Sequence, residues 1–263
     1  MIDRVFNVVE LLADFPEGIP ISDVARRLKT SKSEAHRLLS IFIKRGYAVQ
    51  DEVSKRYRLA IRFAVIGHRF FGKAGLIDLC QPVLDRLAAR TAELARLAVV
   101  ESGSMIFVAN AQGASTGVRY DEELGRIITA PQATANGRVW LATMPTEDAV
   151  ALVKARGFIL PPTYIRSAVT DEASLVTELS KIKQRGFGLS FEEMVQGIAT
   201  VAVAIRERNS GRAVGAVSVS GPAFRLTEAR ALEIAPVVMD AAKELAEIWP
   251  LPRDGGVAPE IKA

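Results

Sequence analysis

The chain has 263 residues, a hydrophobic content of 49% and a formal net charge of +4 at pH 7. The apolar fraction excludes a disordered protein, and no apolar run approaches the roughly 20 residues that a bilayer-spanning helix needs. Residues 1–73 hold 14 of the 34 Lys and Arg but only 8 of the 30 Asp and Glu, which gives this part a net charge of +6. The remaining 190 residues have a net charge of −2. Polyanion binding is therefore expected only in the first part of the chain.

Residues 3–15 predict an amphipathic helix with a broad apolar face. The acidic residues of this segment and its lack of a small-residue cleavage site argue against a signal peptide. Cys80 is the single cysteine, so an intrachain disulfide is impossible and we expect a reducing, cytoplasmic location. In its apolar helical context, Cys80 is interpreted as a packing residue.

Residues 21–46, ISDVARRLKTSKSEAHRLLSIFIKRG, predict two helices joined by a tight turn. The first is expected to begin on Ser22 as its N-cap. The second is expected to begin on Ser31, with Glu34 in a capping box, and to end at Gly46 in a left-handed conformation. The apolar residues predicted to face the core are Val24, Ala25 and Leu28 in the first helix and Leu38, Leu39, Phe42 and Ile43 in the second.

The outer face of the second helix is basic and polar. Its residues are Lys32, Ser33, His36 and Arg37. A short helix of this kind on a small apolar bundle fits the DNA major groove, whereas an ordinary helical hairpin with solvated lysines is the alternative. Charge alone does not distinguish DNA from RNA or a membrane surface, and the helical hairpin favours DNA.

Two β-prone segments, 47–50 and 56–59, flank the polar turn DEVSK and predict a hairpin. Three helices followed by a basic hairpin describe a winged helix-turn-helix. Lys55, Arg56 and Arg58 would then lie on the wing, where they could reach phosphate or the minor groove. A solvated hairpin without a binding role is the alternative.

Residues 60–71 predict a helix with too many apolar side chains for a free linker, interrupted at Gly72 and Gly75. We interpret it as a connecting helix covered by a second copy of the chain, by its own N-terminal domain, or by both. His68 is interpreted as a surface or interface residue.

The rest of the chain lacks regular strand–helix alternation. Helices are predicted at 76–89, 134–142, 146–156 (capped by Thr146), 171–186 and 227–249, and strands at 95–100, 105–109, 187–191, 200–206 and 213–219. This order favours an α+β domain with an antiparallel sheet flanked by helices over a doubly wound parallel sheet. The Pro- and Gly-rich tail beyond Trp249 is expected to be disordered.

Few groups in the second domain could support catalysis. Both histidines lie N-terminal to Cys80, which removes Ser-His-Asp and Cys-His catalysis and the usual zinc ligand sets. No phosphate-binding glycine motif follows a strand. The adjacent acids at 122–123 and 192–193 point to different faces and are poor candidates for a coupled pair. We therefore expect no catalytic residues, metal or cofactor, and favour a binding domain.

Two stretches could line a ligand site. Residues 134–138, TANGR, place small and polar groups at a helix start, where free amides attract anions. In the strand VSVS, Ser218 and Ser220 share one face, and a bound polar ligand could supply their partners. The pattern alone slightly favours solvent or backbone as the partners of these serines.

These segments together resemble the IclR-type bacterial transcriptional regulators over nearly the full chain. The resemblance is carried by residues 21–51 followed by YRLA, by TANGRVWLA, by IKQRGFGLSFEEMVQGIATVAVAI and by AVGAVSVSGPAFRLT. It implies a dimer, or dimer of dimers, that binds a palindromic operator and senses a small metabolite in a GAF-like domain. The effector-binding residues that it implies are Ala135, Asn136, Ser190, Ile198, Thr200, Ser218 and Ser220.

The sequence departs from the family pattern at three positions: Ser190 stands where an acid is common, Thr200 where a cysteine often occurs, and Arg138 where lysine is usual. Glu34 stands where relatives often carry a small hydroxyl residue, so it either caps the recognition helix or sets base preference. A small carboxylate effector fits the family.

The predicted organisation is a winged helix-turn-helix domain at 1–59, a connecting helix at 60–75, an effector-binding domain at 76–250 and a disordered tail at 251–263. The sequence leaves two other functions open. One is a metabolite-converting enzyme with an appended DNA-binding domain, and the other is a DNA-binding protein without an effector.

Overall fold

The computed structural model describes residues 2–122, 124–158, 160, 164–165, 167–208 and 210–250. The chain forms two compact units, Met1–Ala74 and Gly75–Ala263. Within the described ranges no helix is long and apolar enough to span a membrane. The predicted disordered tail, 251–263, lies outside the described residues.

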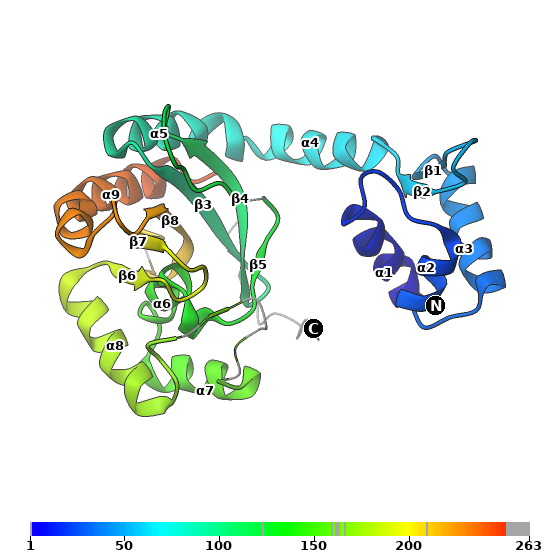
Figure 1. Ribbon diagram of the computed structural model, residues 1–263. Helices are drawn as coiled ribbons and strands as arrows, with labels where there is room; N and C mark the ends of the chain where they lie inside the picture. The colour runs from blue at the N-terminus through cyan, green and yellow to red at the C-terminus, as the bar shows by residue number, and fades with distance from the viewer. Residues whose placement is uncertain are drawn as a thin grey trace. The chain divides into compact units, whose positions relative to one another are not determined.

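The N-terminal unit is a small helical bundle with a two-stranded hairpin (Figure 1). Its elements are α1 (Ile2–Ala13), α2 (Ile21–Arg27), α3 (Lys32–Lys44), β1 (Ala48–Gln50), β2 (Tyr57–Leu59) and α4 (Arg62–Ala74). The strands β1 and β2 pair antiparallel with Val49 opposite Arg58. The core includes Val8, Leu12, Val24, Ala25, Leu38, Leu39, Phe42 and Tyr57. This arrangement is the predicted winged helix-turn-helix.

The sequence predicts both ends of α3 correctly but not the start of α2. Ser31 Oγ accepts a hydrogen bond of 3.1 Å from the Glu34 amide, as predicted. Gly46 ends the helix at φ +73°. The prediction that Ser22 caps α2 is wrong, because the extended Pro20 already serves as N-cap and places Ser22 inside the helix. Ile43 is exposed rather than part of the buried stripe.

The helix α4 extends further than predicted. It continues through Gly72 to Ala74, so the predicted interruption at Gly72 is wrong, and the left-handed Gly75 (φ +68°) follows its last residue. No residue of α4 is buried in the single chain. Val65 is 56% exposed and Phe70 is 60% exposed, which leaves an apolar face without cover from the described residues.

The C-terminal unit is an α+β domain built on one six-stranded antiparallel sheet with the order β5-β4-β3-β8-β7-β6. The strands are β3 (Leu94–Glu101), β4 (Ser104–Gln112), β5 (Ile127–Ile128), β6 (Gly188–Phe191), β7 (Ile198–Arg206) and β8 (Ala213–Pro222). The helices are α5 (Leu76–Thr91), the 3-10 turn η1 (Pro131–Ala133), α6 (Ala135–Leu141), α7 (Thr146–Arg156), α8 (Glu172–Arg185) and α9 (Glu228–Ile248). The predicted antiparallel α+β class is confirmed.

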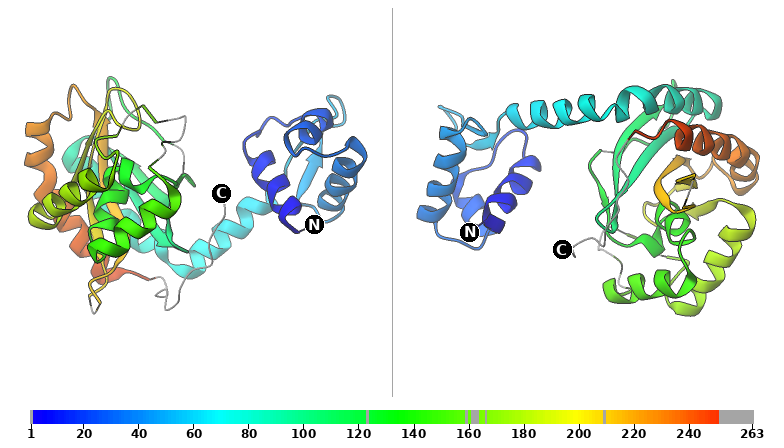
Figure 2. Two further views of the ribbon diagram at one scale, coloured as in Figure 1. Left: turned by 90° about the horizontal axis from the view of Figure 1, so that it is seen from below. Right: turned by 180° about the vertical axis from the view of Figure 1, so that it is seen from behind.

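Helices cover both faces of this sheet. The long helices α5 and α9 pack on one face, and α6, backed by α8, packs on the other (Figures 1 and 2). Asp171 and Thr227 cap α8 and α9 as predicted. Thr146 was expected to cap α7, but Pro145 takes that position. Because successive side chains of a strand point to opposite faces of the sheet, every second side chain faces α5 and α9 and the others face α6.

Candidate functional site

The outer face of α3 presents the polar residues that the sequence singled out. Lys32, Ser33, His36 and Arg37 are all exposed. Ala35, Leu38 and Leu39 on the opposite face are buried in the core of the unit, which fixes the helix on its bundle. The basic side chains are therefore presented on a rigid support rather than on a loop.

Glu34 lies beside these residues, but its carboxylate is already engaged. It accepts a hydrogen bond of 2.5 Å from the Thr30 hydroxyl and forms an ion pair with Arg4 of α1. The Thr30 hydrogen bond, followed by the Arg4 contact, lowers the pKa of Glu34. Its side chain does not complete a capping box at Ser31; instead it ties α3 to α1. Its role in base preference stays a prediction.

The hairpin turn of the wing is organised by Asp51. Asp51 Oδ1 accepts hydrogen bonds from the amides of Ser54 (2.7 Å) and Val53 (3.2 Å), and these bonds lower the pKa of the aspartate. The side chains of Lys55 and Arg58 are exposed on this hairpin.

Arg56 differs from its two basic neighbours on the wing. Its Nη1 donates to the Gly18 carbonyl at 3.2 Å and thereby holds the hairpin against the loop that precedes α2. Lys55 and Arg58 are therefore freer than Arg56 to contact another molecule.

The structure gathers the predicted effector-binding residues on the sheet face that α6 covers. Thr200 of β7 lies opposite Ser190 of β6 on one side and Ser220 of β8 on the other. Ile198 and Ser218 are each two residues away from a member of this row, so they share its face. Ser190 is 7% exposed, and Thr200 shares a 2.8 Å hydrogen bond with Ser220.

Ser218 and Ser220 are completely buried, and their hydroxyls bind side chains. Ser218 Oγ accepts a hydrogen bond of 3.1 Å from Asn136 Nδ2, and Ser220 Oγ accepts one of 2.9 Å from Arg96 Nη2. The slight preference for solvent or backbone partners was therefore wrong. Strand alternation gave the correct shared face, but it could not reveal that α6 closes over it.

The helix α6 supplies Ala135 and Asn136 and is buried along its whole length. Thr134 caps it by accepting a hydrogen bond of 3.0 Å from the Gly137 amide. A Cβ atom on Gly137 would lie 2.3 Å from the carbonyl oxygen of Pro131, so only glycine allows this close approach of η1 and α6. Among the described residues, Asn136 Oδ1 is buried without a hydrogen-bond donor.

Arg96 is the residue in this region that sequence reasoning missed. It is 3% exposed in the middle of β3, directly opposite Ser218. Its guanidinium carbon lies 4.3 Å from the centre of the Phe107 ring and 5.7 Å from that of Tyr120. Burial lowers the pKa of Arg96 to about 10, so the side chain remains a cation at neutral pH.

Glu122 provides the counter-ion of this buried arginine. Its side chain, 9% exposed, forms ion pairs with both Arg96 and Arg126. The Arg126 guanidinium lies 5.8 Å from the centre of the Tyr164 ring. The signal in the sequence was an arginine inside the apolar run LARLAVV, because a buried charge needs a partner. The adjacent acids at 122–123 were judged only as a coupled pair, and the role of Glu122 as the counter-ion of Arg96 was not predicted.

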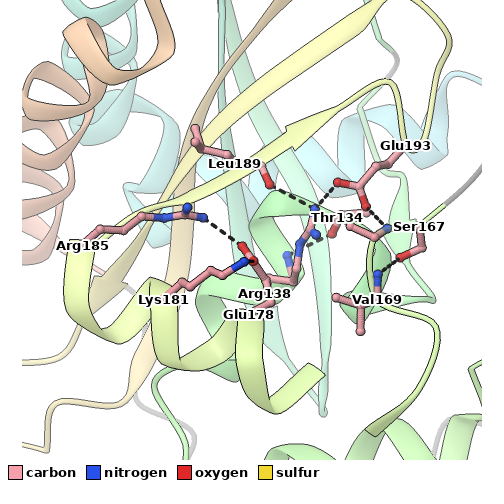
Figure 3. Close-up of polar contacts among 11 residues, drawn as sticks. Thr134, Arg138, Ser167, Val169, Glu178, Lys181, Arg185, Leu189 and Glu193 are labelled. Atoms are coloured by element: carbon pink, nitrogen blue, oxygen red, sulfur yellow. Dashed lines mark hydrogen bonds and ion pairs between the residues drawn. The ribbon is translucent and has the colours of Figure 1, made fainter. Parts of the chain in front are cut away.

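A second buried ion pair joins Arg138 of α6 to Glu193 (Figure 3). Arg138 Nη2 donates to Glu193 Oε1 at 2.6 Å and to the Leu189 carbonyl at 3.1 Å. The other carboxylate oxygen of Glu193 accepts a hydrogen bond of 2.9 Å from the Ala168 amide. Arg138 therefore anchors the segments around residues 168 and 193 to α6. The sequence placed Arg138 in the candidate ligand-lining stretch 134–138 and marked it as a departure from lysine, but its buried ion pair was not predicted.

The described residues contain no group of three His, Cys, Asp or Glu side chains that could hold a metal ion. Cys80 is completely buried, and burial raises the pKa of its thiol to about 11. The polar groups gathered on the α6 face can donate and accept hydrogen bonds and can pair with an anion.

Comparison with known proteins gives one consistent picture. The family model described as "Bacterial transcriptional regulator IclR C-terminal" matches residues 68–247, and the "IclR helix-turn-helix domain" matches residues 1–52. The chain is similar to the HTH-type transcriptional regulator BhcR of Paracoccus denitrificans, with 28% identity over 93% of this chain and 85% of that protein.

Two solved structures have the same fold. An IclR transcriptional regulator from Alicyclobacillus acidocaldarius matches with a TM-score of 0.80 and 20% identity, covering 94% of this chain and 97% of that chain. An IclR homologue from Microbacterium hydrocarbonoxydans, complexed with 4-hydroxybenzoate, matches with a TM-score of 0.75 and 21% identity over 93% of this chain and 96% of that chain.

Proposed function

The chain belongs to the IclR family of bacterial transcriptional regulators, and we propose that a small organic acid bound in its C-terminal unit controls its affinity for an operator. The observation that carries the proposal is the group of polar side chains beneath α6, of which Ser190, Ser218 and Ser220 are buried and Thr200 is half-buried. Polar side chains that converge on one buried sheet face, here together with Asn136 and Arg96, are typical of a small-molecule site. The 4-hydroxybenzoate bound by a protein of the same fold supports an organic acid as the ligand.

DNA recognition is assigned to α3 and the wing. Lys32, Ser33, His36 and Arg37 lie nearest base edges or phosphates when α3 enters the major groove. Lys55 and Arg58 contact the backbone or the minor groove, while Arg56 is held by Gly18 and contributes mainly by positioning the hairpin. Glu34 orients α3 through Arg4 and faces the same groove.

The working form is assigned as a homodimer, or a dimer of dimers, acting in the cytoplasm. The exposed apolar side chains of Val65, Ile66 and Phe70 on α4 are suited to a second copy, which would hold two recognition helices at a fixed separation. Residues 60–75 then act as the connecting helix between a DNA-binding domain at 1–59 and an effector-binding domain at 76–250.

The effector is bound by Ala135, Asn136, Ser190, Ile198, Thr200, Ser218 and Ser220. Binding changes operator affinity through a coupling free energy of about 1–3 kcal/mol, which corresponds to a change of roughly 5- to 150-fold. The similar proteins are regulators by name, which supports a regulatory function.

The test begins by selecting the operator from a random double-stranded library with the full-length protein. Fluorescence anisotropy then measures affinity for the selected duplex at fixed salt, with and without each member of a panel of small carboxylic acids. We expect a sequence-specific complex whose affinity changes at least fivefold with one acid. Binding no tighter than to random duplex, or identical affinity throughout a broad metabolite panel, would contradict the proposal.

A further inference from the structure

The Arg96–Glu122 pair lies at the end of the polar row and is unusual for a structural ion pair. Arg96 comes from the central strand β3, whereas Glu122 comes from the segment 113–126, whose described residues form no helix or strand. Buried ion pairs of this kind contribute little net stability, because desolvation of both charges offsets their attraction. A purely structural role therefore gives little reason for placing the pair at this site.

The hydrogen bonding of this cluster is incomplete. Among the described residues, Arg96 Nε and Asn136 Oδ1 are buried and have no hydrogen-bond partner. Both side chains bind the same stretch of β8, Arg96 at Ser220 and Asn136 at Ser218. An unpaired donor and an unpaired acceptor thus lie along one strand, and a small ligand with an acceptor and a donor would satisfy both.

The cluster also has an excess of positive charge. Of the described ionisable residues in mutual contact here, Arg96 and Arg126 are cations and Glu122 is the single anion. Tyr120 and Tyr164 complete the surroundings, and burial raises the pKa of each, so both rings are neutral at pH 7. Arg96 therefore needs another anion whenever Glu122 is absent, and a planar carboxylate fits the fork of an arginine.

From these observations we propose that Arg96 recognises the carboxylate of the effector and that Glu122 occupies its place until the effector binds. The proposal rests on the function proposed above and identifies the ligand as a monocarboxylic acid. Binding exchanges one carboxylate for another on Arg96, and Asn136 and the serines of β8 contact the remainder of the ligand. Glu122 leaves the site together with its segment, so ligand binding makes the segment 113–126 less ordered.

This exchange predicts that Glu122 competes with the ligand. When a ligand must displace an internal carboxylate, its apparent affinity is reduced in proportion to the fraction of molecules in which the site is open. Glu122→Gln removes the competing charge, and we expect it to bind benzoate roughly tenfold more tightly than the wild type. Arg96→Gln removes the recognising cation, and we expect no measurable benzoate binding.

The experiment is isothermal titration of the full-length protein with acetate and benzoate at constant ionic strength. Acetamide and benzamide serve as uncharged counterparts of the same shape. Asp121→Asn is the matched control, because Asp121 adjoins Glu122 but forms an exposed ion pair with Arg119, and an asparagine oxygen still accepts the hydrogen bond that Gln112 donates to Asp121 Oδ1. It should bind benzoate like the wild type. Hydrogen exchange should show faster exchange in residues 113–126 both in Glu122→Gln and in the benzoate complex.

Equal benzoate affinity in the wild type and Glu122→Gln would overturn the proposal, as would amides that bind as tightly as acids. The absence of binding in every variant would overturn it too. If Arg96→Gln does not fold, the Glu122→Gln and amide comparisons decide alone.

The operator measurement separates this proposal from the proposed function. If a metabolite changes operator affinity equally in the wild type and Glu122→Gln, the regulator function stands and the role of Arg96 fails. If benzoate follows the expected pattern while no acid affects DNA binding, the carboxylate site stands and the proposed control of DNA binding fails.

Discussion

In the N-terminal unit, Lys32 and Arg37 stand on the exposed face of α3, whereas in the C-terminal unit Arg96 and Arg138 are buried and ion-paired. Exposed cations keep their hydration and remain available to a polyanion. Buried cations depend on their partners, so each is tied to the stability of the fold around it. The first arrangement allows DNA contacts to change without unfolding the protein, and the second couples ligand recognition to the conformation of the unit.

The largest effect is expected from breaking the buried Arg138–Glu193 pair. Glu193→Gln leaves Arg138 without a charged partner and should lower the free energy of unfolding by about 3 kcal/mol or more. Both tryptophans, Trp140 and Trp249, lie in the C-terminal unit, so urea unfolding followed by tryptophan fluorescence reports on this unit.

Glu172→Gln is the matched control for this change. Glu172 forms an ion pair with Lys154 in which both side chains are about half exposed, and its loss should cost less than about 1 kcal/mol. Similar losses for the two variants would contradict the distinction between buried and exposed charges.

The next largest effect concerns the exposed face of α3. Arg37→Ala should weaken binding to the selected operator by about 1–3 kcal/mol, because it removes a base or phosphate contact. The thermal unfolding midpoint should stay unchanged. Anisotropy titration at two salt concentrations measures the affinity, and Arg86→Ala, which removes an exposed arginine of the other unit, is the control. Unchanged operator affinity would count against α3 as the recognition helix.

A smaller effect separates two serines at helix starts. Ser31→Ala removes the N-cap of α3 and should destabilise the N-terminal unit by about 1 kcal/mol. Ser22→Ala should have almost no effect, because Pro20 occupies the N-cap position of α2. Native-state hydrogen exchange of the α3 amides measures both variants. Equal protection factors in the two would show that the cap contributes nothing here.

The smallest effect is a pH dependence from Glu34. Its pKa in the folded protein is lowered below the ordinary value of 4.5 by the Thr30 hydrogen bond and then by Arg4. The resulting stabilisation is fully present above pH 4.5 and is lost as the pH falls through the lowered pKa. Glu34→Gln should remove this part of the acid sensitivity of the N-terminal unit. Carboxyl chemical shifts recorded during a pH titration measure the pKa directly.

Local sequence rules were sufficient for most elements and for the α3 surface. Ser31, Gly46, Asp171 and Thr227 mark helix ends through bonds made within a few residues, so a short window contains the information. The same rules failed at Ser22 and Thr146, where a preceding proline takes the cap position. The buried charges could not be assigned in the same way, because Arg96 and Glu122 are brought together by the pairing of distant strands and by a segment without periodicity.

Asn136 Oδ1 and Arg96 Nε are buried without hydrogen-bond partners among the described residues, and a ligand that pairs with them should affect the abundance of the protein in the cell. A ligand that pairs with them binds the folded chain and not the unfolded one. At a concentration a hundredfold above its dissociation constant, it raises the free energy of unfolding by about 2.7 kcal/mol. Proteases and chaperones act on the unfolded fraction, and differences of about 1–2 kcal/mol change protein abundance several-fold. The amount of this regulator should therefore rise with the supply of its effector.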